Sequence, residues 1–199
     1  MARGLVERGY EVVISNSRGP ETLEALAADL GPNATAGTTA DAATGDWVIV
    51  TVPLKAYKQV PVESLASKIV LDTNNYYWER DGHIAALDEK QATTTGLLQE
   101  HLPTSKVVKA FNHIQAAHLT AHSQPAGTAN RRGLVIAGDD APAKATVSAL
   151  LDQFGFDVVD AGPLSESWRI QPGTPGYGPR RSADELRQNL AAAKRNRDE

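Results

Sequence analysis

The sequence of 199 residues contains no cysteine. This absence excludes disulfide bonds, thiolate catalysis and cysteine-based zinc sites. The sequence also lacks any run of about 18 uncharged apolar residues, the length that a membrane-spanning helix needs, and residues 1–9 include no apolar stretch typical of a signal peptide. We therefore expect a cytoplasmic protein with no membrane partner.

An excess of positive charge is also lacking. Lysine and arginine together number 20 against 24 acidic residues, which gives a formal net charge of -4. Without a basic footprint, nucleic acid is not an expected partner. No G-x-S-x-G elbow and no P-loop lysine motif occur, so hydrolase and kinase activities have no support, and we expect a small-molecule substrate.

Short β-branched apolar runs recur along the chain and predict buried strands at 11–14, 47–52, 69–71, 107–111, 134–137 and 157–161. Their continuous rather than alternating pattern is typical of a parallel sheet covered on both faces. Helices are predicted between them, at 21–30 and again after Asp139 or Asp140, where Pro142 suits the first turn and Gly155 the end. The pattern predicts a doubly wound α/β sheet of the Rossmann type.

The start of the chain reads as the end of a helix, capped at Gly9 and followed by the strand at 11–14. In a dinucleotide-binding fold this would be the first helix leading into the second strand, preceded by a strand and a G-x-G-x-x-G phosphate loop. Neither occurs in this sequence. We expect a Rossmann-type sheet lacking its first strand, with Met1 an internal methionine of a longer, N-terminally truncated protein.

The residues that follow the strand at 11–14 decide which nicotinamide cofactor this fold accepts. Ser15, Asn16, Ser17 and Arg18 offer hydroxyls and a guanidinium where an acidic residue would favour NAD, which suits the 2′-phosphate of NADP. The alternative interpretation is a polar turn that merely caps the next helix. The position after the second strand favours NADP binding.

Three later segments follow predicted strands at the edge where such folds bind ligands. Val52, Pro53 and Leu54 would pass beside the cofactor, although a proline at a strand end is common without function. The loop 72–82 is dense in polar and aromatic residues. In the third segment, Asn112 and His113 are the candidate catalytic residues, because the Asn112 amide both donates and accepts hydrogen bonds.

Other polar residues favour a structural interpretation. His118 and His122 are four residues apart, but no carboxylate pattern such as H-E-x-x-H accompanies them, so no metal site is expected. The arginine pairs at 131–132 and 180–181 are expected to be solvated, although either could meet an anionic ligand.

Taken together, these segments resemble the NADPH-dependent coenzyme F420 reductase family, in its actinobacterial NADP oxidoreductase branch. The resemblance rests on Ser15–Arg18, Val52–Leu54, the Asp-Thr-Asn-Asn-Tyr run at 72–76, Lys109–Ile114, Gly138–Asp140 and Asp160–Leu164. It implies that Ser17, Arg18 and Thr22 hold the 2′-phosphate, that Val52 and Pro53 flank the cofactor, and that 112–116, with Ala116 at its end, line the hydride-transfer cleft. It also implies a homodimer.

The resemblance implies NADP as cofactor and coenzyme F420 as substrate, within an NADP-binding Rossmann-like domain at 1–164. Residues 165–199 are expected to form an extension of a Pro/Gly loop, a short helix at about 182–193 and a frayed tail from 194. Deazaflavin reductases carry an apolar helix where this chain has the loop 168–181. Two alternatives stay open: a reductase of another acceptor, such as a flavin or imine, and a non-catalytic nucleotide-binding or interaction module.

Overall fold

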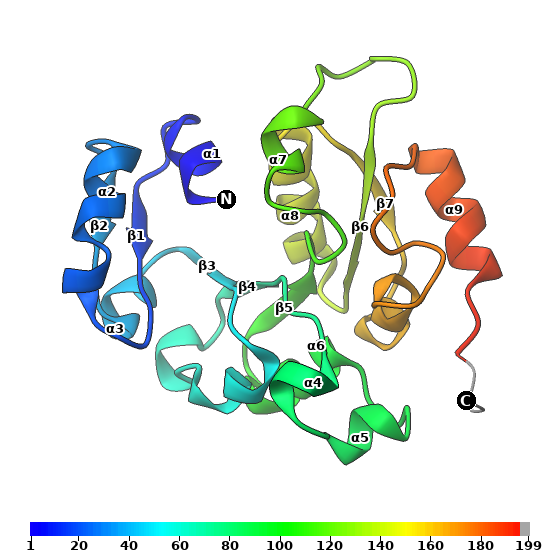
Figure 1. Cartoon of the computed structure of the whole chain (residues 1–199), viewed down its shortest axis with the longest axis horizontal. Helices are drawn as coiled ribbons and strands as arrows, with labels where there is room; N and C mark the ends of the chain where they lie inside the picture. Colours follow the sequence, from blue (N-terminus) through cyan, green and yellow to red (C-terminus); the bar gives the residue numbers. More distant parts are fainter. Residues whose placement is uncertain (196–199) are drawn as a thin grey trace.

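Two sheets form the framework of the protein, whose computed structural model describes residues 1–195. The smaller sheet pairs β1 (Val12–Ile14) with β2 (Ala34–Ala36) in parallel. The larger sheet has the order β3-β4-β5-β6-β7. Its strands are β3 (Trp47–Val50), β4 (Ile69–Asp72), β5 (Lys106–Lys109), β6 (Gly133–Gly138) and β7 (Asp157–Asp160). Figure 1 shows the smaller sheet in a lobe of its own beside the larger one.

The expected doubly wound α/β fold is confirmed, but one strand direction differs from the prediction. Strands β3, β4 and β5 are parallel, as are β6 and β7, whereas β5 pairs with β6 in antiparallel fashion. All six residues of β6 are buried. A continuous apolar run reports that both faces of a strand are covered, and it carries no information on direction, so the sequence could not reveal the reversal.

Helices cover both faces of β6, which explains its apolar run. Leu134 and Ile136 lie in a core cluster with α8 (Ala141–Gln153), whereas Val135 packs with Leu186 and Leu190 of α9 (Ala183–Ala192). Asp140 caps α8 by accepting a bond from the Ala143 amide at 2.8 Å. Ser182 caps α9 in a capping box with Glu185.

The remaining elements are short. The helices are α1 (Ala2–Val6), α2 (Glu24–Leu30), α3 (Thr39–Ala42), α4 (Trp78–Asp81), α5 (Ala85–Asp88), α6 (Thr94–His101) and α7 (His118–Ala121). Four 3-10 turns join them: η1 (Pro20–Thr22), η2 (Leu54–Gln59), η3 (Glu63–Leu65) and η4 (Leu164–Ile170). The helix predicted at 21–30 is thus a 3-10 turn followed by α2, and neither β2 nor α6 was predicted.

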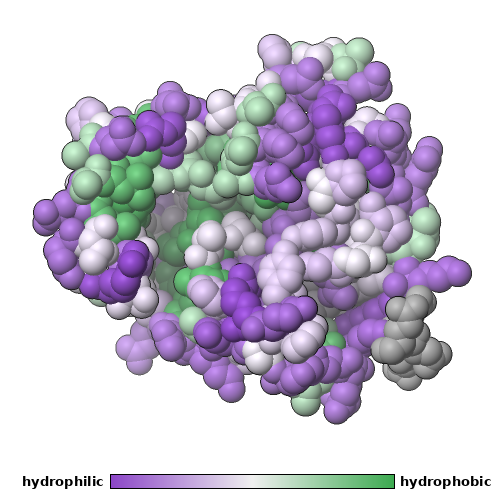
Figure 2. All heavy atoms as spheres, in the orientation of Figure 1, coloured by the Kyte–Doolittle hydropathy of each residue, from purple (hydrophilic) through white to green (hydrophobic). Residues whose placement is uncertain are grey.

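The two sheets meet through side chains, because no strand lies between β1 and β3 in the part of the chain that the structure describes. Tyr10, just before β1, packs edge-on against Trp47 with 5.8 Å between ring centroids, and its hydroxyl bonds Gln153 of α8 at 3.0 Å. Leu5 of α1 joins the same core as α8. Figure 2 shows a hollow lined by apolar residues between the lobe and the rest of the protein.

The C-terminal segment packs onto the larger sheet. The loop between η4 and α9 spans residues 171–182, and Arg195 donates a hydrogen bond to the Ala92 carbonyl at 2.6 Å. Arg195 is therefore held, in contrast to the frayed tail predicted from residue 194, and residues 196–199 lie outside the described residues. Within residues 1–195, no helix is both long and apolar enough to span a bilayer.

Candidate functional site

Three loops meet at the carboxyl ends of β3, β4 and β5, where a parallel sheet of this type binds its ligands. The Val52 amide donates to the Asn74 side-chain oxygen at 3.0 Å, which joins the loop after β3 to the loop after β4. Asn75 donates to the Asn112 carbonyl at 2.7 Å, and the Asn112 amide group donates back to the Asn75 side-chain oxygen at 3.1 Å. The structure therefore brings Val52 and Asn112 to one polar edge.

Asn112 lies at the centre of this edge and is buried. Its Nδ2 also donates to the Ile170 carbonyl at 2.7 Å, whereas its Oδ1 is buried without a hydrogen-bond partner among residues 1–195. The preceding Phe111 adopts a φ of 58°, in the left-handed region that a bulky side chain rarely occupies. Such backbone strain collects at functional sites, and here it accompanies an unused acceptor.

A buried ion pair supports the edge from below. Lys109 and Asp72, at the ends of β5 and β4, are almost fully buried with 3.1 Å between Nζ and Oδ2. Asp72 also accepts from the Thr95 hydroxyl at 2.7 Å and from the Asn74 amide at 2.8 Å. Burial lowers the pKa of Lys109 and the Asp72 charge opposes that shift. Because these polar groups hold one another, the pair fixes the positions of the loops above it.

His113 faces the interior rather than the cleft. Its Nε2 accepts a hydrogen bond from the Val135 amide at 2.9 Å, so the remaining hydrogen is on Nδ1. Burial, followed by the charges of Arg132 and Lys109, lowers the pKa of His113 to about 3. The imidazole is thus neutral at pH 7 and bonded to β6, which favours a structural role; its catalytic role stays a prediction.

The Pro/Gly loop 171–182 covers part of the edge. Tyr177 contacts the Tyr77 hydroxyl at 2.5 Å and accepts from the Asn75 amide at 3.4 Å. Burial, followed by the Tyr77 contact, raises the pKa of Tyr177. Nothing in the sequence pointed to Tyr177, because its partners are about 100 residues away along the chain. The loop is a fixed part of the site.

The turn after β1 is well ordered and open. The Asn16 side chain accepts from the Arg18 amide at 2.8 Å and donates to the Thr22 hydroxyl at 2.9 Å, while that hydroxyl donates to the Gly19 carbonyl at 2.8 Å. Ser17 and Arg18 are exposed, and the Arg18 guanidinium makes no hydrogen bond or ion pair among residues 1–195. These hydrogen bonds all join residues of the turn to one another, and none of them connects the turn to the edge around Asn112.

The other predicted cofactor residues differ in exposure. Pro53 and Ala116 are exposed and Val52 is half-buried, so each is accessible to a ligand. Leu54 is completely buried. Its assignment to the cofactor stays a prediction that this packing does not favour.

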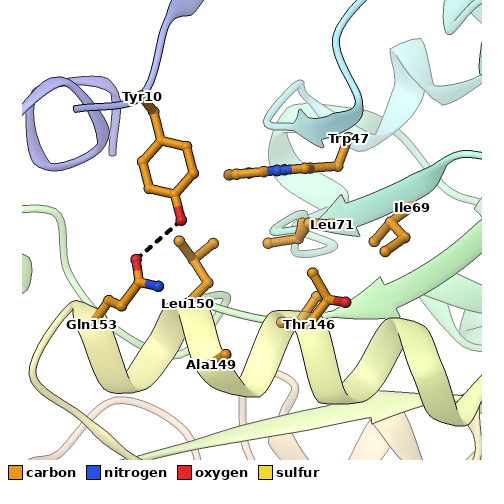
Figure 3. A pocket seen from close by; sticks show the side chains of 9 residues that line it. Tyr10, Trp47, Ile69, Leu71, Thr146, Ala149, Leu150 and Gln153 are labelled. Atoms are coloured by element: carbon orange, nitrogen blue, oxygen red, sulfur yellow. Dashed lines mark hydrogen bonds between the residues drawn. The ribbon is translucent and has the colours of Figure 1, made fainter. Parts of the chain in front are cut away.

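An apolar cavity lies at the opposite end of the strands. It has a volume of about 280 Å³ and lies between the sheet and α8 (Figure 3). Trp47 and Ile69, the first residues of β3 and β4, line it, with Tyr10 and Leu150. Because ligands of such sheets bind beyond the carboxyl ends, this apolar cavity is a gap in packing between the two sheets rather than the cofactor site.

One prediction about charged residues was wrong. Arg131 and Arg132 are both buried, not solvated. Arg131 pairs with Asp152 and Asp157, whereas Arg132 contacts His118 and His122. The sequence could not show this, because the partners come from separate elements.

Comparisons with known proteins agree with this arrangement. Residues 1–76 match the family described as NADP oxidoreductase, coenzyme F420-dependent. These residues include the Arg18 turn, the loop after β3 and Asn74 with Asn75. This segment of the chain is therefore similar to that family.

The sequence match to a curated protein covers a short part of the chain, whereas matches to solved structures cover most of it. YjhV of Escherichia coli K12 is 42% identical over 53 residues, which is 27% of this chain and 39% of YjhV. The hypothetical protein SMa0349 of Sinorhizobium meliloti has a TM-score of 0.76 and 28% identity, over 91% of this chain and 88% of that one. A candidate F420-dependent NADP reductase from Arthrobacter sp. FB24 has a TM-score of 0.70 and 27% identity, over 84% and 80%. The chain therefore has a Rossmann-type fold, and its first 76 residues are similar to a family of NADP oxidoreductases.

Proposed function

We propose that the protein is an NADP(H)-dependent oxidoreductase that transfers hydride between NADPH and a deazaflavin, coenzyme F420, or a similar small acceptor. The observation that carries the proposal is the turn after β1. There the internally bonded Asn16 holds an exposed Arg18 whose guanidinium has no partner within residues 1–195. The family description supports the deazaflavin as acceptor.

The chemistry of this turn fits a phosphate monoester. A guanidinium forms short, charge-assisted bonds to phosphate oxygens and loses little freedom in doing so. The Ser17 hydroxyl is exposed beside it. The side-chain bonds of Asn16 and Thr22 fix the backbone in advance, so binding requires little further ordering of the chain. The 2′-phosphate, which NADP has and NAD lacks, is the ligand group that matches.

Nicotinamide and deazaflavin rings supply the hydride chemistry themselves, so the protein provides position and surroundings. Asn112 is held by the Asn75 side chain and the Ile170 carbonyl, with its Oδ1 unused. This oxygen is suited to accept a bond from a ring amide of a ligand. His113 is neutral near pH 7, because its pKa is lowered to about 3. The site therefore orients a ligand and needs no acid-base pair.

The test is calorimetric titration of the chain with NADPH and, separately, with NADH. We expect NADPH to bind at least about tenfold more tightly, since charge-assisted bonds to a phosphate are worth ~1.5–3 kcal/mol. A second assay follows oxidation of NADPH, with oxidised F420, a flavin or a cyclic imine as the hydride acceptor. Equal affinity for both nucleotides, or no binding of either, would contradict the proposal.

A further inference from the structure

Arg131 and Arg132 are neighbours in sequence and both are buried, but in the described part of the chain only Arg131 has a counter-charge. The Arg131 guanidinium lies 2.6 Å from Asp152 and 3.2 Å from Asp157. Arg132 is 1% exposed and forms no ion pair with a carboxylate among residues 1–195. A buried charge without a partner of opposite sign is costly, so the surroundings of Arg132 call for an anion.

Neutral groups make up the contacts of Arg132. Its Nη1 lies 2.7 Å from His122 Nδ1 and 3.4 Å from His118 Nδ1. Its Nη2 donates to the carbonyls of Gly178 and His113 at 3.3 and 3.5 Å, and its Nε is buried with no partner among the described residues. Only the His122 contact is short, so the guanidinium is poorly satisfied.

These contacts fix the protonation of the two imidazoles. A guanidinium donates hydrogen bonds and never accepts them, so Nδ1 of both His118 and His122 must be the acceptor. In a neutral imidazole the hydrogen is then on Nε2. Burial lowers the pKa of His122, which keeps it neutral at pH 7.

The two rings present these hydrogens side by side. His118 begins α7 and His122 follows its last residue, so they lie one helical turn apart on one face. The rings stack with 4.1 Å between centroids and 14° between planes. Because both Nδ1 atoms face Arg132, both Nε2–H groups lie on the opposite edge, and both residues are half-exposed. The result is a pair of parallel donors with a positive charge behind them.

We propose that His118 and His122, backed by Arg132, form a binding site for an oxyanion, either a phosphate or a carboxylate group. A two-oxygen edge of such a group matches two adjacent N–H donors, and the Arg132 charge behind the rings favours an anion at this place. A metal ion is disfavoured, because Nδ1 is occupied and Nε2 has its hydrogen.

Arg132 itself lies next to the residue that follows Asn112, since it contacts the carbonyls of His113 and Gly178. The inference goes beyond the proposed function, because an oxyanion would bind here whether or not a nicotinamide nucleotide binds at Arg18.

The experiment uses the imidazole signals of the five histidines in NMR spectra. Sodium phosphate and sodium acetate are titrated separately against chloride at constant ionic strength, so the two sources of an oxyanion are distinguished. We expect saturable shifts of His118 and His122 with one or both salts, while His83, His101 and His113 stay unchanged. Shifts that do not saturate, or that include the exposed His83 equally, would overturn the proposal.

Nitrogen-15 spectra of the same sample give the tautomers directly, and both His118 and His122 should have the hydrogen on Nε2. Hydrogen on Nδ1 of His122 would overturn the geometry on which the site depends. In a matched pair of variants, His122→Ala should weaken binding of the anion about tenfold, the worth of one hydrogen bond to a charged group. The control His83→Ala, which removes another exposed imidazole, should leave it unchanged.

Discussion

The turn after β1 and the edge around Asn112 are both polar, but they are built in opposite ways. At the edge, groups from segments far apart in the sequence bond one another, and a buried ion pair supports them. In the turn, the bonds are local and the charged Arg18 remains exposed. We infer from the comparison that the edge stabilises the folded protein and positions its loops, whereas the turn selects between NADPH and NADH. Substitutions should therefore separate the two properties.

The largest effect on stability is expected for Lys109→Met. This change leaves Asp72 buried without its counter-charge, which should lower the free energy of unfolding by about 3–5 kcal/mol. Urea unfolding measures the change. The control is Lys144→Met, because its partner Asp160 is 49% exposed and solvent screens the pair, which should contribute under about 1 kcal/mol. Equal losses in the two variants would show that burial of the Lys109 pair has no special importance.

His113 should make stability depend on pH. Its folded pKa of about 3 lies below the ordinary value of 6.5, so between these values the unfolded chain binds the proton that the folded chain refuses. Stability should fall as the pH drops from about 6.5 towards 3, by at most about 1.4 kcal/mol per pH unit from this group. His113→Gln, which keeps an acceptor for the Val135 amide, should flatten the slope in urea unfolding at pH 4 to 7. An unchanged slope would contradict the assignment.

Asn112→Ala should affect both stability and turnover. The change leaves the Ile170 carbonyl and the Asn75 side-chain oxygen without a donor, which should cost about 1–3 kcal/mol in unfolding experiments. Turnover should fall, while the affinity for NADPH measured by calorimetry stays near that of the unchanged protein. A variant that loses NADPH binding instead would place Asn112 in the nucleotide site rather than at the acceptor.

The sequence predicted local features well and distant partnerships poorly. The β-branched runs located all five strands of the larger sheet, and Asp140 with Pro142 located the start of α8, because burial and capping leave local patterns. β2 escaped because Ala34–Ala36 is too short and too weakly apolar to stand out. The antiparallel β6, the cover provided by Tyr177 and the burial of Arg132 depend on contacts between distant segments. The candidate residues at Asn16–Arg18 and Asn112 could be predicted from the sequence because they directly follow strands.

The smallest effect on stability and the largest effect on specificity are expected for Arg18→Ala. The exposed guanidinium has no partner in the described part of the chain, so unfolding in urea should change by no more than about 0.5 kcal/mol. The matched control is Arg187→Ala, an exposed arginine on α9 that pairs only with Asp184.

The most direct test of the account is calorimetric titration of the unchanged protein, Arg18→Ala and Arg187→Ala with NADPH and NADH. The account predicts that Arg18→Ala weakens NADPH binding about tenfold and leaves NADH binding unchanged, while Arg187→Ala alters neither. If Arg18→Ala binds NADPH as tightly as the unchanged protein, the turn after β1 does not read the 2′-phosphate and the central claim is wrong.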